Sequence, residues 1–500
     1  MRYRIVLSVV LGVVAVTAFT TGRGGWRANP SESGPGTYVY MPAPPVRTYP
    51  SSQATIQRWI DADDSVRIRR HAWDIWESIT HSTLFNQPIW QTWYSGYELF
   101  EDSTNETRAK ARGVHGLVQF ERRVIPRGRR APRLPRSPDG IPFDLAERTF
   151  AFNRFTQSAA QFIWKNRLNQ GNTLRDTLNA LVANGTPIAS QQVLTSPDST
   201  DASQFVIKTV FQFVSGTELT AVPYWAGDDT TFVYDTLNPV PSRWRQAVAL
   251  DPLNKYKSGD SVLMVVNNEP PRKLRVAHLD EFYSIKITPA DSVHFSHFGP
   301  INGDFIGVAN DTSAQAVYMA MRPGNIGLLM AMHVTGKEIP NWTWQSFWWA
   351  NNPNNTYYGH DRPVSIKTPW NHYNMTAGYA MTHANGSRLI AFNPYLETSL
   401  EGKIPDTVAT RSDSLSWTGV ITNCMACHRR AAIGWGGNAD TLGTTPPYGP
   451  AMFVKAGDSV VFTQPVNGVR VPVLKTDFLW SVAIRGSAPT GTANARVRKR

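Results

Sequence analysis

The chain contains 500 residues, of which 41% are hydrophobic and 18% are charged, and its formal net charge is +12. This composition excludes an intrinsically disordered chain, because the apolar residues, including 17 Trp, 17 Tyr and 22 Phe, suffice to build a packed core. The length fits one large domain or two modest ones, and the 36 Gly and 35 Pro residues favour a turn-rich, β-rich architecture over a helical bundle.

Residues 1–22 have the pattern of a secretory signal peptide. Arg2 and Arg4 precede an apolar stretch from Ile5 to Phe19, and small residues follow it. The stretch is shorter than the roughly 20 apolar residues that a membrane span needs. We therefore expect a periplasmic or secreted mature protein. The alternative is that the segment is retained as an N-terminal membrane anchor, or that the protein associates peripherally with the membrane.

Residues 23–140 form an aromatic and basic N-terminal region. It begins with a stretch rich in Gly, Pro and Ser, which is typical of an extended entry segment. In residues 54–80 apolar side chains recur at helical spacing, as at Ile56, Trp59 and Ile60. We predict helical structure there.

Positive charge is concentrated in residues 108–136 and in a basic tail, residues 486–500. Pro and Gly interrupt the first segment, which indicates a loop. A solvated loop is the simpler interpretation. The alternative is a surface that docks to an acidic redox partner protein, because such charge steers encounter. No nucleic-acid-binding motif is visible, so we predict no nucleic acid partner.

The segment 144–168 is predicted to be a helix that packs on the core. Asp144 and Glu147 form a capping box at its start. Phe152 and Phe155 begin an apolar face at helical spacing that continues to the end of the segment.

From about residue 204 the pattern changes to short β-like runs that turn residues separate. These runs read QFVIKTVFQFV, WRQAVAL, SVLMVVN, IGLLMAMHV and SRLIAFN. Residues 452–474 also alternate and are broken by Gly and Pro. We predict an α+β fold with a mainly β core, in residues 141–485, and helices at its N-terminal side.

The two cysteines of the chain, Cys424 and Cys427, lie in the sequence NCMACH and are followed by His428. C-x-x-C-H is the attachment sequence for c-type haem. Each thiol adds to one vinyl group of the porphyrin, and the adjacent histidine becomes the proximal ligand of the iron. A structural disulfide explains the pair poorly, because it would close only a very short loop. The motif therefore predicts one covalent haem c in a segment near the C-terminus.

Two other uses of the cysteine pair are less well supported. A thioredoxin-type redox pair needs a βαβ setting, and no such repeat surrounds the motif. A zinc site needs two further ligands at matching spacing, and the chain has no second C-x-x-C and no H-x-x-x-H.

His333 is the leading candidate for a second iron ligand or for a hydrogen-bond donor on the distal side. It ends a predicted buried strand and precedes Lys337 and a Trp-rich segment. The simpler interpretation is an aromatic core with a hydrogen-bonded histidine. Other candidates are Met330, Met332, His294, His297, His372, Met375, Met381, His383 and Met452.

The combination resembles a family of large, secreted bacterial cytochrome c proteins with a single C-terminal haem motif. The matching stretches are FNRFTQSAAQFIWKNRL, VIKTVFQF, LLMAMHVTGKEIPNWTWQSFWW and NCMACHRRAA, within roughly residues 145–430. The residues that match are His333, Lys337, Trp342, Trp344, Cys424, Cys427 and His428. The resemblance implies haem c and export, and it implies no particular reaction.

Three functions are compatible with these observations. The leading hypothesis is an exported mono-haem cytochrome that transfers single electrons, with His428 and His333 or a methionine on the iron. The second is a haem enzyme, peroxidase-like or acting on another small ligand, in which His333 or Lys337 serves as acid, base or hydrogen-bond donor at an open distal site. The third is a haem-based sensor or binding protein.

Overall fold

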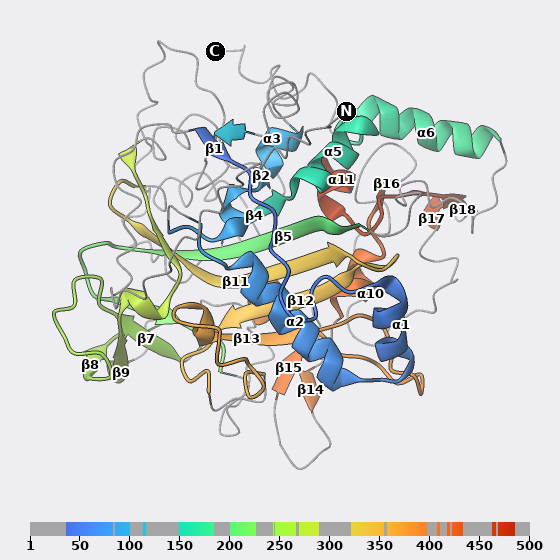
Figure 1. The fold of residues 1–500 in the computed structure, drawn as a ribbon. Helices are drawn as coiled ribbons and strands as arrows, with labels where there is room; N and C mark the ends of the chain where they lie inside the picture. Colours follow the sequence, from blue (N-terminus) through green and yellow to red (C-terminus); the bar gives the residue numbers. More distant parts are fainter. Residues whose placement is uncertain are drawn as a thin grey trace, which may run out of the picture.

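In the computed structural model a seven-stranded antiparallel sheet lies at the centre of the molecule (Figure 1). The structure describes residues 37–83, 86–100, 114–116, 150–184, 201–226, 244, 246–266, 270–289, 322–354, 358–397, 408–410, 418–420, 423–433, 463–466 and 469–485. The predicted signal segment 1–22, most of the basic segment 108–136 and the tail 486–500 lie outside these residues.

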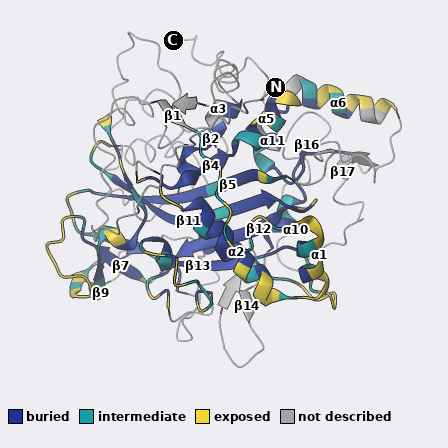
Figure 2. Cartoon of the chain, in the orientation of Figure 1, coloured by how far each residue is buried: buried dark blue, intermediate teal, exposed yellow. Residues whose placement is uncertain are grey.

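The strand order of the central sheet is β13-β12-β11-β5-β4-β2, and β10 also pairs with β11. The strands are β2 (Tyr94–Ser95), β4 (Phe150–Phe155), β5 (Asp201–Val214), β10 (Ser284–Lys286), β11 (Ile326–Lys337), β12 (Thr343–Trp349) and β13 (Tyr373–Ala377). The two longest strands, β5 and β11, are neighbours at the centre. Most of their residues are buried, because other elements cover both faces of the sheet (Figure 2).

A second sheet has the order β6-β7-β9-β8, and β7 and β9 run parallel. Its strands are β6 (Thr220–Pro223), β7 (Ala247–Leu250), β8 (Ser261–Met264) and β9 (Arg272–Ala277). Short antiparallel pairs join β1 (Thr37–Val39) to β3 (Val114–Gly116), β14 (Val408–Thr410) to β15 (Thr418–Val420), β16 (Ala432–Ile433) to β19 (Leu474–Lys475), and β17 (Thr463–Val466) to β18 (Val469–Pro472). The expected mixed α+β fold with mostly sheet content is confirmed.

The helical segment predicted for residues 54–80 is confirmed as two helices, α1 (Gln53–Asp61) and α2 (Ser65–Ile79). The break falls at Asp63, whose φ of 52° cannot continue a right-handed helix. Ser52 caps α1 by accepting from a backbone N–H, and Asp64 caps α2 in the same way.

Helix α2 and the later helix α10 (Cys424–His428) lie on opposite faces of the central sheet. The α2 side chains Trp73 and Trp76 pack on Phe347 of β12, with ring centroids 5.7 and 4.1 Å apart. Trp344 of the same strand packs instead on His428 of α10, at 4.4 Å. Residues three apart in a strand face opposite sides, so the sheet separates the two helices.

The prediction of a single helix over 144–168 is wrong in its central part. Residues 150–155 form strand β4, and helix α5 (Gln157–Lys165) begins only after Thr156, whose backbone is extended. All six residues of β4 are buried and pair with β5. Pairing with a strand far along the chain decides the conformation here, and the local spacing cannot reveal it. The predicted capping box lies outside the described residues.

The run SRLIAFN was also expected to be a strand, and the structure shows only isolated bridges there, at Arg388 and Ala391. The remaining described helices are α3 (Gly96–Phe100), α6 (Gly171–Ala183), α9 (Pro394–Glu397) and α11 (Trp480–Arg485), with short 3-10 turns η1 (Ile89–Thr92), η5 (Leu279–Glu281) and η6 (Trp370–His372). Among the described residues, no helix has the length and apolar character that a membrane crossing requires.

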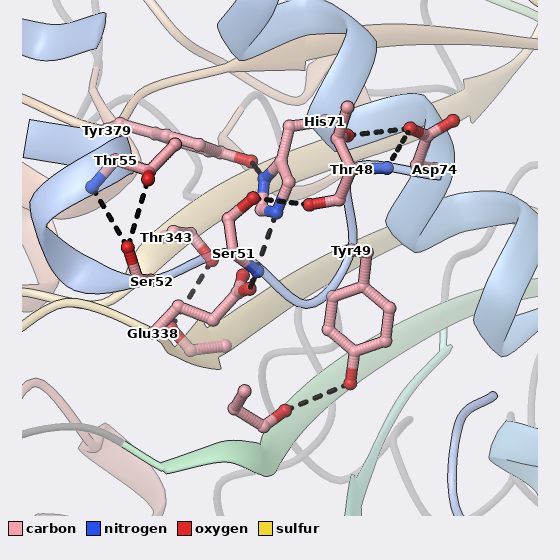
Figure 3. A network of polar contacts seen from close by, with 12 residues as sticks. Thr48, Tyr49, Ser51, Ser52, Thr55, His71, Asp74, Glu338, Thr343 and Tyr379 are labelled. Atoms are coloured by element: carbon pink, nitrogen blue, oxygen red, sulfur yellow. Dashed lines mark hydrogen bonds and ion pairs between the residues drawn. The ribbon is translucent and has the colours of Figure 1, made fainter. Parts of the chain in front are cut away.

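A buried polar network ties α2 and the segment before α1 to the end of β11 (Figure 3). His71 Nδ1 lies 2.7 Å from the Tyr379 hydroxyl, and His71 Nε2 lies 3.3 Å from Glu338 Oε1. Glu338 also accepts from the Ser51 backbone N–H at 2.9 Å. His71, Glu338 and the neighbouring Asp74 are fully buried. Polar groups in such a position stabilise a fold only when they have partners, so these contacts fix how α2 sits on the sheet.

An ion pair on the same side of the sheet yields a stability prediction. Arg69 of α2 donates two hydrogen bonds of 2.6 Å to Asp361, and Trp73 Nε1 donates a third at 3.0 Å. Burial raises the pKa of Asp361, but the hydrogen bonds and charge of Arg69 outweigh it and hold that pKa below its ordinary value of 3.8. Because the folded pKa is depressed, the pair stabilises the fold above the unfolded pKa and ceases to do so as pH falls through the folded one.

We expect Asp361→Asn to lower the free energy of unfolding by about 1–2 kcal/mol at pH 7. The difference between wild type and variant should begin to shrink below about pH 4, where Asp361 of the unfolded wild-type chain becomes protonated, and should be lost as pH falls through the lower folded pKa. Urea unfolding at pH 7 and pH 3 measures both values. A difference that is the same at the two pH values would contradict the assignment.

Candidate functional site

Cys424, Cys427 and His428 all lie on one helical turn, α10. Residues at positions i, i+3 and i+4 share one face of a helix, so the three side chains project to the same side. Cys424 is buried and Cys427 is half-buried, and no disulfide joins them. The turn therefore presents two sulfur atoms and one imidazole together, which is the arrangement that attachment of a porphyrin edge requires.

The start of α10 is held by contacts with the segment after β13. Asn423 caps the helix by accepting from Ala426 N–H at 3.0 Å, and its own amide donates to the carbonyls of Ala380 and Leu389 at 3.0 and 2.7 Å. A Cβ at Gly378 would lie 2.8 Å from the Ala391 Cβ and 3.4 Å from Asn423 Nδ2. Only glycine permits this close approach, so the place of the cysteine turn is well defined.

His428 is held in one tautomer by a backbone contact. Its Nδ1 lies 2.8 Å from the Phe478 carbonyl oxygen, and a carbonyl can only accept. Nδ1 therefore carries the hydrogen, and in the neutral ring Nε2 keeps its lone pair. Burial lowers the pKa of His428 to about 4, against the opposing effect of the Phe478 hydrogen bond, so the ring is neutral at pH 7. Trp344 packs against it at 4.4 Å.

His333 lies on β11, on the same face of the sheet as α10. In the register it is directly opposite Lys208 of β5 and Ser346 of β12, and directly opposed residues point to the same face. Trp344, two residues from Ser346, also shares that face. His333 is the one residue of β11 that is only half-buried. Its ring centroid lies 6.5 Å from that of His428, with the ring planes at 48°.

The separation of the two imidazole centroids is close to that of two rings bound to one metal ion. Metal–imidazole bonds are about 2 Å long, so two rings on opposite sides of one ion have centroids roughly 6 Å apart. Burial, followed by the charges of His428 and Lys208, lowers the pKa of His333 well below its ordinary value. Both rings are therefore neutral and offer a lone pair, which a metal ligand must do.

Three cationic residues surround the other end of the cysteine turn. Arg429 and Arg430 follow His428 and are buried, as is Lys475, whose ammonium group donates to the Arg429 carbonyl. Burial, with the charges of both arginines, lowers the pKa of Lys475 to about 7. Positive charge beside a metal centre favours the reduced state of that centre, so Arg429 and Arg430, together with a Lys475 that is only partly charged at pH 7, would raise the potential of a metal bound here.

The other candidate residues divide into three groups. Met332 and Met375 are directly opposite Thr209 and Phe347 in the register, and so point to the α2 face, away from His333. Met381 lies near the cysteine turn, with its sulfur 3.7 Å from Arg429 Nη1.

The third group comprises residues in other parts of the structure and residues outside the described part of the chain. His383 forms an exposed ion pair with Asp63, and His372 belongs to turn η6. Met330 lies at a β-bulge within β11 and is fully buried. His294, His297 and Met452 lie outside the described residues.

Lys337, considered above as a possible acid or base, instead forms a buried ion pair with Asp477 at 2.8 Å. Asp477, the Phe478 carbonyl and Lys208 are site residues that the sequence analysis did not identify. Lys208 could have been identified from the sequence, because it is a cation inside the apolar run VIKTVF. For the other two there was no signal, because they reach the site through contacts with distant parts of the chain.

In the part of the chain that the structure describes, no group of three or more His, Cys, Asp or Glu side chains is arranged to hold a metal ion. A haem iron needs only two protein ligands, because the porphyrin supplies the other four. Comparison of the whole chain with known families and proteins gives no further guide: no protein-family model, curated protein or solved structure matches it.

Proposed function

We propose that this protein is an exported mono-haem c-type cytochrome that transfers single electrons. Cys424 and Cys427 are its attachment residues, His428 is the proximal ligand, and His333 is the distal ligand. The basic segment 108–136 is the docking surface for an acidic redox partner. The proposal thus adopts the leading interpretation of the sequence and assigns a residue to each side of the iron.

The observation that carries the proposal is the pairing of the two imidazoles. The hydrogen bond from His428 Nδ1 to a carbonyl directs the lone pair of Nε2 outward, as in metal-ligating histidines generally. His333 then lies at a distance from His428 that suits the opposite side of one ion.

A haem bound here supplies a one-electron couple between ferric and ferrous iron. The chain sets the conditions for that couple. Trp344 of the buried strand β12 covers one side of the proximal imidazole, and two neutral histidines give a lower potential than a histidine with a methionine. Such a site suits exchange of electrons at low potential with a partner protein.

A spectrum tests the proposal. We expect the purified protein, treated with alkaline pyridine and dithionite, to show the absorption of one c-type haem per chain. In its native state the iron should be low-spin and should not bind carbon monoxide. A colourless protein would refute the proposal. High-spin iron that binds carbon monoxide at once would favour the haem enzyme or the sensor and remove His333 from the iron.

A further inference from the structure

The backbone that provides the Phe478 carbonyl adopts an unfavourable conformation. Asp477 and Phe478 have φ values of 45° and 69°, in the left-handed region that bulky residues rarely occupy. Such conformations persist only when the surrounding structure holds them. An external contact must therefore fix these two residues, and with them the oxygen that accepts the Nδ1 hydrogen of His428.

Backbone hydrogen bonds at Thr476 and Leu479 hold the ends of this segment, and the contact made by Asp477 itself is its ion pair with Lys337. Lys337 Nζ donates to both carboxylate oxygens of Asp477, at 2.9 and 2.8 Å, and to the Pro340 carbonyl at 2.8 Å. The two side chains are 1% and 3% exposed, and Nζ lies 4.9 Å from the centroid of the Trp342 ring. Since both charges are desolvated, neither can exchange its partner for water without a large cost in free energy.

The pair also connects the two candidate ligands through a rigid element. Lys337 ends β11, the same strand that carries His333. Asp477 precedes Phe478, which binds His428. The strand that places one imidazole therefore also holds the segment that orients the other.

We infer that Lys337 is a positioning residue for His428: through Asp477 it sets the place of the Phe478 carbonyl, and so the tautomer and direction of the imidazole. The inference rests on the proposed function and deepens it. A hydrogen bond from Nδ1 makes a ligand imidazole more basic, and a more basic ligand favours oxidised iron. Loosening the pair should therefore raise the reduction potential.

The test uses the full chain with two variants. Lys337→Met removes the cation and leaves the Asp477 carboxylate buried without it, which is strongly destabilising. The double variant Lys337→Met with Asp477→Asn removes both charges, and Asn tolerates the positive φ of position 477 as Asp does. The measurements can therefore be made on the double variant if the single variant does not fold. Arg69→Met is the matched control, because it breaks the ion pair with Asp361 on the other face of the sheet.

Two measurements decide the outcome: the midpoint reduction potential, and ¹⁵N-histidine NMR of His428. We expect a higher potential and loss of the Nδ1–H tautomer signal in the double variant, with both unchanged in Arg69→Met. A double variant that folds and keeps both the wild-type potential and the wild-type tautomer would overturn the inference. If the protein contains no haem, the proposed function fails by itself, and the NMR measurement on the haem-free chain still decides whether Lys337 positions His428.

Discussion

Replacement of both Cys424 and Cys427 by serine is expected to abolish covalent haem and leave the fold in place. Cys424 is 3% exposed and donates to the Ala391 carbonyl at 3.3 Å. A serine hydroxyl has nearly the same shape and can make the same hydrogen bond, so the turn should keep its structure. It cannot form a thioether. The alkaline pyridine spectrum and the intact mass should then show no attached haem, and circular dichroism should match that of wild type.

Met425→Leu is the control for this experiment, because Met425 lies in the same turn and is buried. The change conserves volume and is tolerated in most cores, so this variant should keep its haem. A double serine variant that carries as much covalent haem as wild type would show that the two thiols do not attach it.

The second large effect is expected for His333→Ala. If His333 is the distal ligand, its removal leaves the iron with the His428 imidazole and one vacant position. The absorption spectrum should change from low-spin to high-spin, and carbon monoxide, excluded in wild type, should bind to completion. Optical spectra with and without carbon monoxide measure both effects.

His383→Ala provides the comparison, because His383 lies in an exposed ion pair with Asp63. Exposed ion pairs contribute little to stability, so neither stability nor the iron spectrum should change. Identical spectra for wild type and His333→Ala would remove His333 from the iron and return the search to Met381 and to the residues that the structure does not describe.

The fold was predictable where the local pattern and the tertiary contacts agree. The apolar run that ends at His333 and the aromatic run after it are the strands β11 and β12. The helices α1 and α2 follow the spacing of their buried tryptophans. Residues 150–155 were assigned to a helix because phenylalanines at positions 152 and 155 have the spacing of one helix face. Strand β4 is buried on both faces, so it shows no alternation that would reveal a strand. Only the pairing with β5 makes them a strand.

The candidate site shows the same division. The spacing of Cys424, Cys427 and His428 predicts a chemistry, because the proposed haem attachment needs two thiols and an imidazole on one helical turn. The place of His333 at the end of a buried strand made it a candidate. Its proximity to His428 depends on tertiary contacts, which the sequence does not reveal. The carbonyl of Phe478 and the carboxylate of Asp477 carry no pattern of their own, since any backbone has carbonyls and most aspartates are solvated.

The burial of Cys424 has a consequence for the order of events during maturation. In the folded chain its sulfur is enclosed by the core and bonded to the Ala391 carbonyl, beyond the reach of a ligating enzyme. If the chain carries haem c, as proposed, attachment takes place while residues 423–428 are still undocked, before the core encloses them. A chain that folds before attachment would then accept the proposed haem only after that turn opens again.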